Sequence, residues 1–273
     1  MARRDFARRT VVVTGAAGGL GRALCRRFGA AGANIAALDS DAAGAAALAV
    51  ELRALGIAAQ DFACDVTDPQ ACAASISQAV TRFGGLDVLI NNAGITHRSG
   101  FAQTDAAVIR RVMEVNFFGA VHCTRAALAP LVASRGLIIV ISSVAGFAPL
   151  IARTGYAASK HALHGFFDSL RTEIADDGVE VLMVCPSFID TGIAKNALGA
   201  DGLPALHAQR VVGTRATPAA IVEQIFRAAC RGDRLLLPGG TAWLSWWVSR
   251  LAPRLYAKLM ADSLRAELHG TNQ

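Results

Sequence analysis

The fold is decided near the N-terminus by the stretch Thr10-Val-Val-Val-Thr14-Gly15-Ala-Ala-Gly18-Gly19-Leu20-Gly21. Its first five residues form a short apolar, β-branched run, which predicts a buried strand. The glycine-rich turn leads into an Ala-, Leu- and Arg-rich helix that we expect to end near Ala31. Glycine lets the backbone of such a turn approach a pyrophosphate, and the helix N-terminus offers free N–H groups to it. A tight strand-to-helix connection without a ligand is the alternative for this turn taken alone.

Strand and helix patterns alternate along the rest of the chain. Further strands are expected at 32–38, 57–63, 86–90, 137–141, 179–185 and 234–237. Helices are expected at 41–55, 69–83, 105–134, 156–176 and 217–232. This alternation predicts an α/β fold with a doubly wound, parallel seven-stranded sheet, a Rossmann fold, over residues 1–240. Residues 192–216 have no firm periodicity, and we expect a mobile lid there.

An acidic residue ends the second expected strand. Asp39 lies about 20 positions after the glycine-rich turn, where a carboxylate hydrogen-bonds the adenosine ribose hydroxyls and repels a 2′-phosphate. No Lys or Arg directly follows Asp39 or lies between Gly15 and Gly19, which favours NAD over NADP. Capping of the next helix is the alternative role for Asp39, although Ser40 or Asp41 can cap it instead. Asp65, at the end of the third strand, can bond an adenine amino group or cap a turn.

Asparagine stands at two unusual places. Asn91-Asn92-Ala-Gly94 follows the fourth expected strand, and a structural turn at the edge of the cofactor site is its simplest interpretation. Asn116 falls inside an expected helix, where Asn competes for backbone hydrogen bonds. A special role, such as opening a carbonyl to water, is one interpretation of Asn116, and a merely tolerated Asn is the other.

The candidate catalytic residues follow the fifth strand. Ser143 ends the apolar run at 137–141, and Tyr156 and Lys160 are four apart on one face of the next helix. The pKa of a free tyrosine is about 10, and an adjacent ammonium favours the phenolate. A Ser hydroxyl at the strand edge, facing this Tyr, can hydrogen-bond a substrate oxygen. An ordinary surface Tyr and Lys is the alternative for the pair alone.

Composition excludes several classes of protein. Of the 273 residues 53% are hydrophobic and 18% charged, which indicates a large buried core rather than disorder. The net charge is +6, yet no basic-aromatic module indicates nucleic-acid binding. The six scattered cysteines lack zinc spacing and are expected as buried thiols in a reducing compartment, so no metal is predicted. No apolar stretch marks a signal peptide, no run reaches the roughly 18 uncharged apolar residues of a spanning helix, and a cytoplasmic location is expected.

Together these motifs make the chain resemble the short-chain dehydrogenase/reductase family over roughly residues 8–240. They are TGxxxGxG at 14–21, NNAG at 91–94, the mid-helix Asn, and the Ser thirteen residues before YxxxK. The resemblance implies that Tyr156 is the general acid/base, that Lys160 lowers its pKa and holds the nicotinamide ribose, that Ser143 orients the substrate oxygen, and that Asn116 holds a relay water. The implied cofactor contacts are Gly15, Gly19, Leu20, Gly21, Asp39, Asp65, Val66, Asn92, Tyr156, Lys160, Ile189 and Thr191.

The resemblance also implies a homodimer or homotetramer built on the helices at 105–134 and 156–176. One departure is Pro186-Ser187, where the family usually has Pro-Gly; the added hydroxyl bears on substrate preference and loop shape. The expected activity is hydride transfer between NAD and a secondary alcohol or ketone. A non-catalytic nucleotide-binding or scaffold protein is the alternative, although a binder needs no Ser–Tyr pair. A dehydratase or epimerase usually needs a larger substrate domain.

The C-terminal extension, 241–273, is predicted to be amphipathic and helical, with a break at Pro253. Its apolar positions recur at helical spacing: Trp243, Leu244, Trp247, Val248, Leu251, Leu255, Leu259 and Met260. Basic residues lie between them: Arg250, Arg254, Lys258 and Arg265. The extension can pack on its own domain or a partner subunit, or lie at a membrane surface, and either role is compatible with walling an apolar pocket. We expect a hydrophobic substrate and peripheral membrane contact through these helices.

Overall fold

The computed structural model describes residues 4–190, 192–194, 196–205 and 215–265. Its strands are β1 Thr10–Thr14, β2 Asn34–Asp39, β3 Ala59–Ala63, β4 Val88–Asn91, β5 Leu137–Ile141, β6 Glu180–Val184 and β7 Leu235–Leu236. Its α-helices are α1 Gly19–Ala30, α2 Ala42–Ala54, α3 Pro69–Phe83, α4 Ala106–Met113, α5 Gly119–Ser134, α6 Thr154–Glu173, α7 Pro218–Arg231, α8 Gly239–Leu251 and α9 Pro253–Leu264. Shorter turns are η1 Phe101–Gln103, η2 Glu114–Phe118, η3 Val144–Gly146 and η4 Gly192–Ala194.

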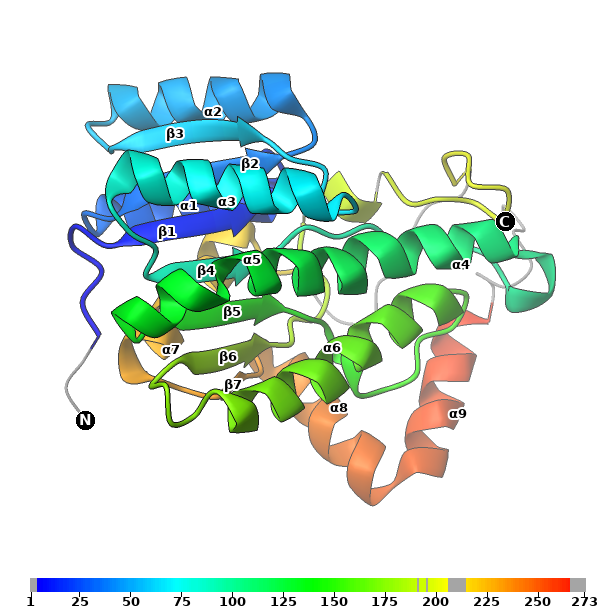
Figure 1. The fold of residues 1–273 in the computed structure, drawn as a ribbon. Helices are drawn as coiled ribbons and strands as arrows, with labels where there is room; N and C mark the ends of the chain where they lie inside the picture. The colour runs from blue at the N-terminus through cyan, green and yellow to red at the C-terminus, as the bar shows by residue number, and fades with distance from the viewer. Residues whose placement is uncertain (1–3, 191, 195, 206–214, 266–273) are drawn as a thin grey trace.

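The seven strands form one sheet in the order β3-β2-β1-β4-β5-β6-β7 (Figure 1), and every pairing is parallel. The predicted doubly wound Rossmann fold is confirmed. The strand order reverses between β1 and β4, and ligands of such sheets bind at the carboxyl ends of the strands beside this reversal. The glycine-rich turn, Asp39, Asn92 and Ser143 all lie at or just after the carboxyl ends of strands, so one edge of the sheet gathers them.

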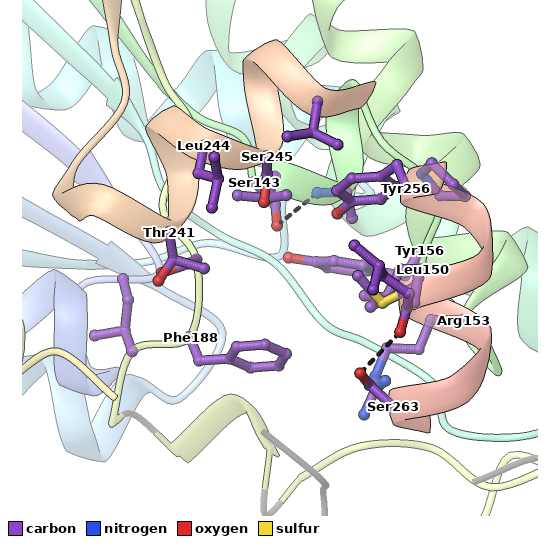
Figure 2. Close-up of a pocket in the computed structure, with 18 of the residues that line it drawn as sticks. Ser143, Leu150, Arg153, Tyr156, Phe188, Thr241, Leu244, Ser245, Tyr256 and Ser263 are labelled. Carbon is purple, nitrogen blue, oxygen red and sulfur yellow. Dashed lines mark hydrogen bonds between the residues drawn. The ribbon is translucent and has the colours of Figure 1, made fainter. Parts of the chain in front are cut away.

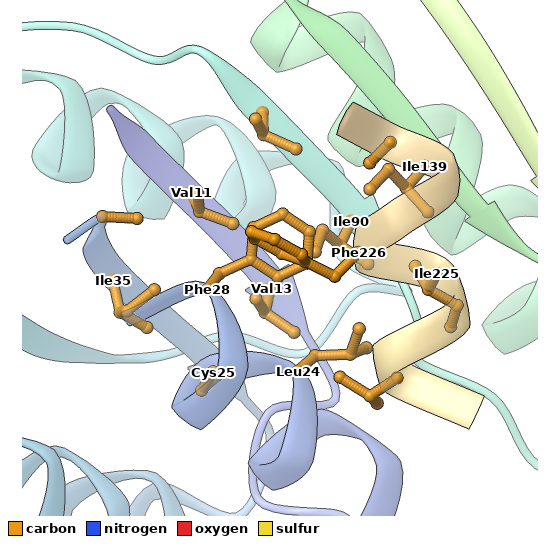
Figure 3. Packing of buried hydrophobic residues seen from close by; sticks show 14 of the residues in the cluster. Val11, Val13, Leu24, Cys25, Phe28, Ile35, Ile90, Ile139, Ile225 and Phe226 are labelled. Carbon is orange, nitrogen blue, oxygen red and sulfur yellow. The ribbon is translucent and has the colours of Figure 1, made fainter. Parts of the chain in front are cut away.

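Alternation along the strands divides the core between two helical layers. Val11 and Val13 face one layer, which contains α1, α2 and α7. Figure 3 shows Phe28 of α1 against Phe226 of α7 above β1, with ring centroids 5.2 Å apart. Val12 faces the other layer, formed by α3, α5 and α6. Because both faces are covered, the central strands are apolar throughout, as parallel sheets require.

The long helix expected at 105–134 is continuous but changes pitch at η2, a π-helical turn between α4 and α5. Among the described residues, Ala106–Ser134 is the one helix long and apolar enough to cross a membrane by length and composition. Here α5 buries Cys123, Ala127 and Leu131 in the core cluster beneath the sheet, so it is a core helix of this fold.

Two helices follow β7. The expected break at Pro253 is confirmed, because α8 ends at Leu251 and α9 begins at the proline. Figure 1 shows α8 and α9 standing out from the sheet as a pair beside β7 and α6.

Candidate active site

The glycine-rich turn has the geometry of a dinucleotide cradle. Gly15 has a φ of +62°, and a Cβ there would lie 2.8 Å from Ala93 Cα. A Cβ on Gly21 would lie 2.1 Å from the Gly15 carbonyl oxygen, so a side chain is excluded. Helix α1 begins at Gly19, continues with the nearly buried Leu20, and has no side-chain cap. Uncapped N–H groups beside a close backbone fit a pyrophosphate.

Asp39 ends β2 beside this turn. Its Oδ2 accepts from the Ala17 N–H at 2.8 Å and its Oδ1 from the Asp41 N–H at 2.9 Å. The cap of α2 is Asp41, which accepts from the Gly44 N–H at 2.9 Å, so the capping alternative for Asp39 is wrong. A basic side chain that sequence reasoning missed lies close by: Arg22 donates to the carbonyl oxygens of Ala17 at 2.9 Å and Gly44 at 3.1 Å.

Three further residues implied as cofactor contacts, Asp65, Val66 and Asn92, also stabilise the local structure. Asp65 Oδ1 accepts from both the backbone N–H and the hydroxyl of Thr67, at 3.0 and 2.9 Å, which supports the turn interpretation. Val66 is buried, and its side chain fills the space beside Gly119. Asn92 donates to the carbonyl oxygens of Thr14 at 2.9 Å and Gly15 at 3.0 Å, and thereby holds the glycine-rich turn.

Asn116 lies inside η2 and is buried. Its amide clamps Ile95, accepting from the N–H at 2.8 Å and donating to the carbonyl at 3.0 Å, and also donates to Ser159 Oγ at 2.9 Å. A π turn replaces the usual helical bonding, and here the Gly119 N–H reaches back to the Glu114 carbonyl. The unusual residue and the unusual pitch therefore coincide.

Tyr156, Ser143 and Lys160 come together at the carboxyl end of β5. Lys160 is buried and donates to the Ile141 carbonyl at 2.9 Å, with its Nζ 5.6 Å from the Tyr156 ring centroid. A Cβ on Gly94 would lie 3.3 Å from Asn116 Oδ1 and 3.7 Å from Lys160 Nζ, so the NNAG turn closes over both groups.

The electrostatics of this cluster differ from the sequence expectation. Burial lowers the pKa of Lys160 to about 8. Burial also raises the pKa of Tyr156, while its hydrogen bond with Ser143 and the charge of Arg153 act in the lowering direction. In the protein alone the phenol is therefore the favoured form of Tyr156, and the charge of Arg153, which no motif indicated, lowers its pKa.

His97 holds the N-terminus of α6, a role that no sequence motif indicated. Its Nε2 accepts from the Gly155 N–H at 2.9 Å, so its proton lies on Nδ1, 3.2 Å from Ser99 Oγ. Ser99 Oγ lies 2.8 Å from Thr104 Oγ1, which donates to the Gly100 carbonyl. Burial lowers the pKa of His97 to about 4. His97 is therefore a cap of α6 that comes from a distant part of the chain.

A cavity of about 420 Å³ lies in front of Ser143 and Tyr156. The catalytic side also contributes Thr96, the buried Arg153, Ser187, Phe188 and Ile189. The opposite side is formed by α8 and α9, and Figure 2 shows Leu244, Ser245, Tyr256 and Ser263 projecting from them toward this space. Ser187, the departure from the family pattern, therefore lines the cavity. Thr191 lies outside the described residues.

Parts of the expected lid are also described. Ile193 lines the cavity, and the segment 197–205 is tied to the chain before α4: Leu198 exchanges backbone hydrogen bonds with Thr96 and Arg98. Residues 195 and 206–214 lie outside the described part, so a moving lid stays a prediction.

Within the described residues, no group of three or more His, Cys, Asp or Glu side chains is arranged to hold a metal ion. His164 Nε2 instead lies 3.1 Å from Ser142 Oγ, and His161 Nδ1 lies 2.9 Å from the Ala157 carbonyl. All six cysteines are free and buried.

Known proteins resemble this chain along most of its length. The family model for short chain dehydrogenase matches residues 9–201. Dehydrogenase/reductase SDR family member 7B of Bos taurus is 37% identical over 265 residues, 94% of this chain and 82% of that protein. The protein of the same name from Danio rerio is 33% identical over 267 residues, 95% of this chain and 86% of that protein. The 11-beta-hydroxysteroid dehydrogenase A of Arachis hypogaea is 34% identical over 261 residues, 92% of this chain and 74% of that protein.

Proposed function

The chain belongs to the short-chain dehydrogenase/reductase family and is an oxidoreductase acting on CH–OH groups, and from that premise we propose that it transfers a hydride between NAD and a hydrophobic secondary alcohol or ketone. One observation carries the proposal: Ser143 and Tyr156 together line a cavity of about 420 Å³. The apolar side chains that α8 and α9 contribute to this cavity, such as Leu244 and Val248, support a hydrophobic substrate.

The proposed chemistry uses two hydroxyl groups on one substrate oxygen. A bound nicotinamide supplies the hydride donor or acceptor. Tyr156 exchanges a proton with the substrate oxygen, and Ser143 hydrogen-bonds the same oxygen as charge develops on it. Because burial keeps the resting phenol protonated, Tyr156 in this state is set to donate, as reduction of a ketone requires. After Tyr156 donates its proton, it must be protonated again. Lys160, whose Nζ lies 5.6 Å from the Tyr156 ring centroid, and the π turn at Asn116 are the groups proposed to supply that proton.

The preference for NAD rests on Asp39. Its carboxylate lies at the end of β2 beside the glycine-rich turn, where it can accept from ribose hydroxyls and repel a 2′-phosphate. Arg22 is the nearby cation that could serve NADP, but its guanidinium is bonded to the carbonyl oxygens of Ala17 and Gly44. The residues proposed to hold the dinucleotide are Gly15, Gly19, Leu20, Gly21, Asp39, Asp65, Val66, Asn92, Tyr156, Lys160, Ile189 and Thr191.

The test is nicotinamide absorbance over a panel of secondary alcohols and ketones, with NAD and with NADP, beside Tyr156→Phe. We expect turnover with NAD and a loss of about 10²–10⁴-fold in kcat in the variant, with cofactor affinity retained. Undiminished turnover in Tyr156→Phe would contradict the acid/base role. Turnover with NADP alone would contradict the role of Asp39, and cofactor binding without turnover would favour the non-catalytic alternative.

We also propose a homodimer or homotetramer through the long helices, a cytoplasmic location, and peripheral membrane contact through α8 and α9. The partly exposed Phe118, at the junction of η2 with α5, supports a subunit contact on that face. The six free thiols support a reducing compartment. Light scattering of the purified protein measures the oligomeric state, and a monomer at all concentrations would contradict the subunit contact.

A further inference from the structure

Exposed apolar side chains gather on α8 and α9. Among the described residues, six of the twelve exposed large hydrophobic side chains lie on these two helices: Trp243, Leu244, Trp247, Leu251, Leu255 and Leu259. We call these six the apolar stripe. A monomeric soluble protein rarely gathers so much apolar surface without using it for binding. The two helices stand out from the sheet in Figure 1, and the six side chains of the apolar stripe are 45% to 77% exposed.

The charge beside the apolar stripe indicates what covers it. Residues 239–265 contain four basic side chains, Arg250, Arg254, Lys258 and Arg265, against one acidic side chain, Asp262. Arg250 stacks on Trp246, with its Cζ 3.2 Å from the ring centroid, and the other three basic side chains are exposed. Arg254 and Lys258 are four apart on α9, next to the side that carries Leu255 and Leu259. Tryptophan and leucine flanked by Lys and Arg suit an anionic lipid surface.

The apolar stripe also borders the cavity. On α8, positions 243, 247 and 251 share one side, and the adjacent strip, Leu244 and Val248, lines the cavity. On α9, Leu255 and Leu259 are four apart and lie on the same side of the helix. Leu259 also lines the cavity, together with Met260. Leu244 and Leu259 are thus both exposed and part of the cavity wall. The cavity therefore reaches the surface at the edge of the apolar stripe.

We propose that α8 and α9 dock on an anionic bilayer and that the substrate passes from the bilayer between Leu244 and Leu259 into the cavity. This inference rests on the proposed function and adds the source of the substrate to it. The apolar stripe replaces water at the cavity mouth with lipid, so a hydrophobic alcohol or ketone reaches Tyr156 without crossing water.

Docking is tested by fluorescence, because all three tryptophans lie on α8. The probes are mixed phosphatidylcholine–phosphatidylglycerol vesicles and pure phosphatidylcholine vesicles. We expect a blue shift of the emission with the mixed vesicles and a weaker effect with the neutral ones. The double variant Leu251→Ser/Leu255→Ser keeps every tryptophan and the cavity lining, and should bind the mixed vesicles at least about tenfold more weakly. Arg254→Gln/Lys258→Gln should weaken binding by roughly tenfold or more.

A matched control is available on α2 and its C-cap, where Val50 and Leu55 are 59% and 63% exposed, compared with 51% for Leu255. Val50→Ser/Leu55→Ser should bind the vesicles as the wild type does. Equal loss in this control would overturn the proposal, as would wild-type emission that does not respond to mixed vesicles. A blue shift that grows with protein concentration in the absence of vesicles would show that a second copy covers the apolar stripe, and would also overturn it.

Passage of the substrate is tested by kinetics with two ketones, one dissolved in water and one held in the vesicles. In Leu251→Ser/Leu255→Ser, kcat/KM should fall about tenfold for the vesicle-held ketone and change less than about twofold for the water-soluble one. An equal fall for both would overturn the passage. Vesicle binding without turnover of any alcohol or ketone would overturn the proposed function and leave the docking in place.

Discussion

The two walls of the cavity are built in different ways. The catalytic wall carries Ser143 and Tyr156, at the end of β5 and the start of α6. Asn116 and Lys160 lie outside the cavity lining and bond to the backbone of Ile95 and Ile141. The outer wall, α8 and α9, buries only Ala242, Tyr256 and Leu264 and exposes the apolar stripe. The difference teaches that the edge of the sheet fixes the proposed reacting groups, whereas two lightly attached helices shape the other side of the cavity.

The largest expected effect is on cofactor binding, and it comes from substitution in the glycine-rich turn. Gly21→Ala places a Cβ 2.1 Å from the Gly15 carbonyl oxygen, so the turn must move and cofactor binding should be lost. Gly18→Ala is the matched control, because its Cβ would lie 3.4 Å from the same oxygen at an ordinary φ of −73°. Isothermal titration with NAD compares them. If both variants bind alike, close backbone approach is not what the turn requires.

Substitution of one serine on each wall compares the two walls directly, since Ser143 and Ser245 line the same cavity from opposite sides. Ser143→Ala should lower kcat about 10²–10³-fold, because it removes a donor to the developing oxyanion. Ser245→Ala should act mainly on KM, because the outer wall contacts the substrate away from the reacting oxygen. Steady-state kinetics measures both, and comparable losses of kcat would show that the walls share the chemistry.

Attachment of the outer wall should depend on few side chains. Leu264 is fully buried, and Leu264→Ala should cost about 2–5 kcal/mol of stability where α9 packs. Leu251 is 77% exposed, and Leu251→Ala should change stability by less than about 0.5 kcal/mol. Urea unfolding followed by tryptophan emission reports on α8 itself. A cost for Leu251→Ala as large as for Leu264→Ala would mean that the apolar stripe is covered within the protein.

Lowering the pH should reduce the stability of the protein through protonation of His97, which caps α6. Its pKa falls from 6.5 to about 4 on folding, so between these pH values the unfolded chain binds a proton that the folded chain excludes. Stability should therefore fall as pH drops through this window, by at most about 3 kcal/mol. His97→Ala should cost roughly 1–3 kcal/mol at neutral pH, because the buried Gly155 N–H loses its acceptor, and should reduce the acid sensitivity.

His161→Ala is the control for this prediction, since His161 is exposed on the same helix. Urea unfolding at pH 7 and near pH 4.5 should show little change in its pH dependence relative to the wild type. Unaltered acid sensitivity in His97→Ala would assign the effect to other groups, of which His164, with its pKa also lowered by burial to about 4, is the first candidate.

The sequence by itself determined the fold and the place in it of the groups proposed to react. Apolar runs at 10–14 and 137–141 became central strands, because a strand buried on both faces must be apolar throughout. The positions of Ser143, Tyr156 and Lys160 resulted from that sheet, since the carboxyl ends of parallel strands all meet at one edge. An Asn inside an expected helix indicated a special role for Asn116, and the structure has a π turn at that position.

Tertiary structure decided what surrounds those groups. The cap that His97 places on α6 joins residues 58 positions apart, and no local pattern records it. No sequence motif includes Arg153, and the fold buries it at the N-cap of α6, where its charge acts on the phenol of Tyr156. The periodicity of 241–264 predicted amphipathic helices but left open what their apolar sides meet. Only the docking of α8 and α9 across from Tyr156 divided those sides into a cavity wall and an exposed stripe, because burial depends on which distant surface a helix meets.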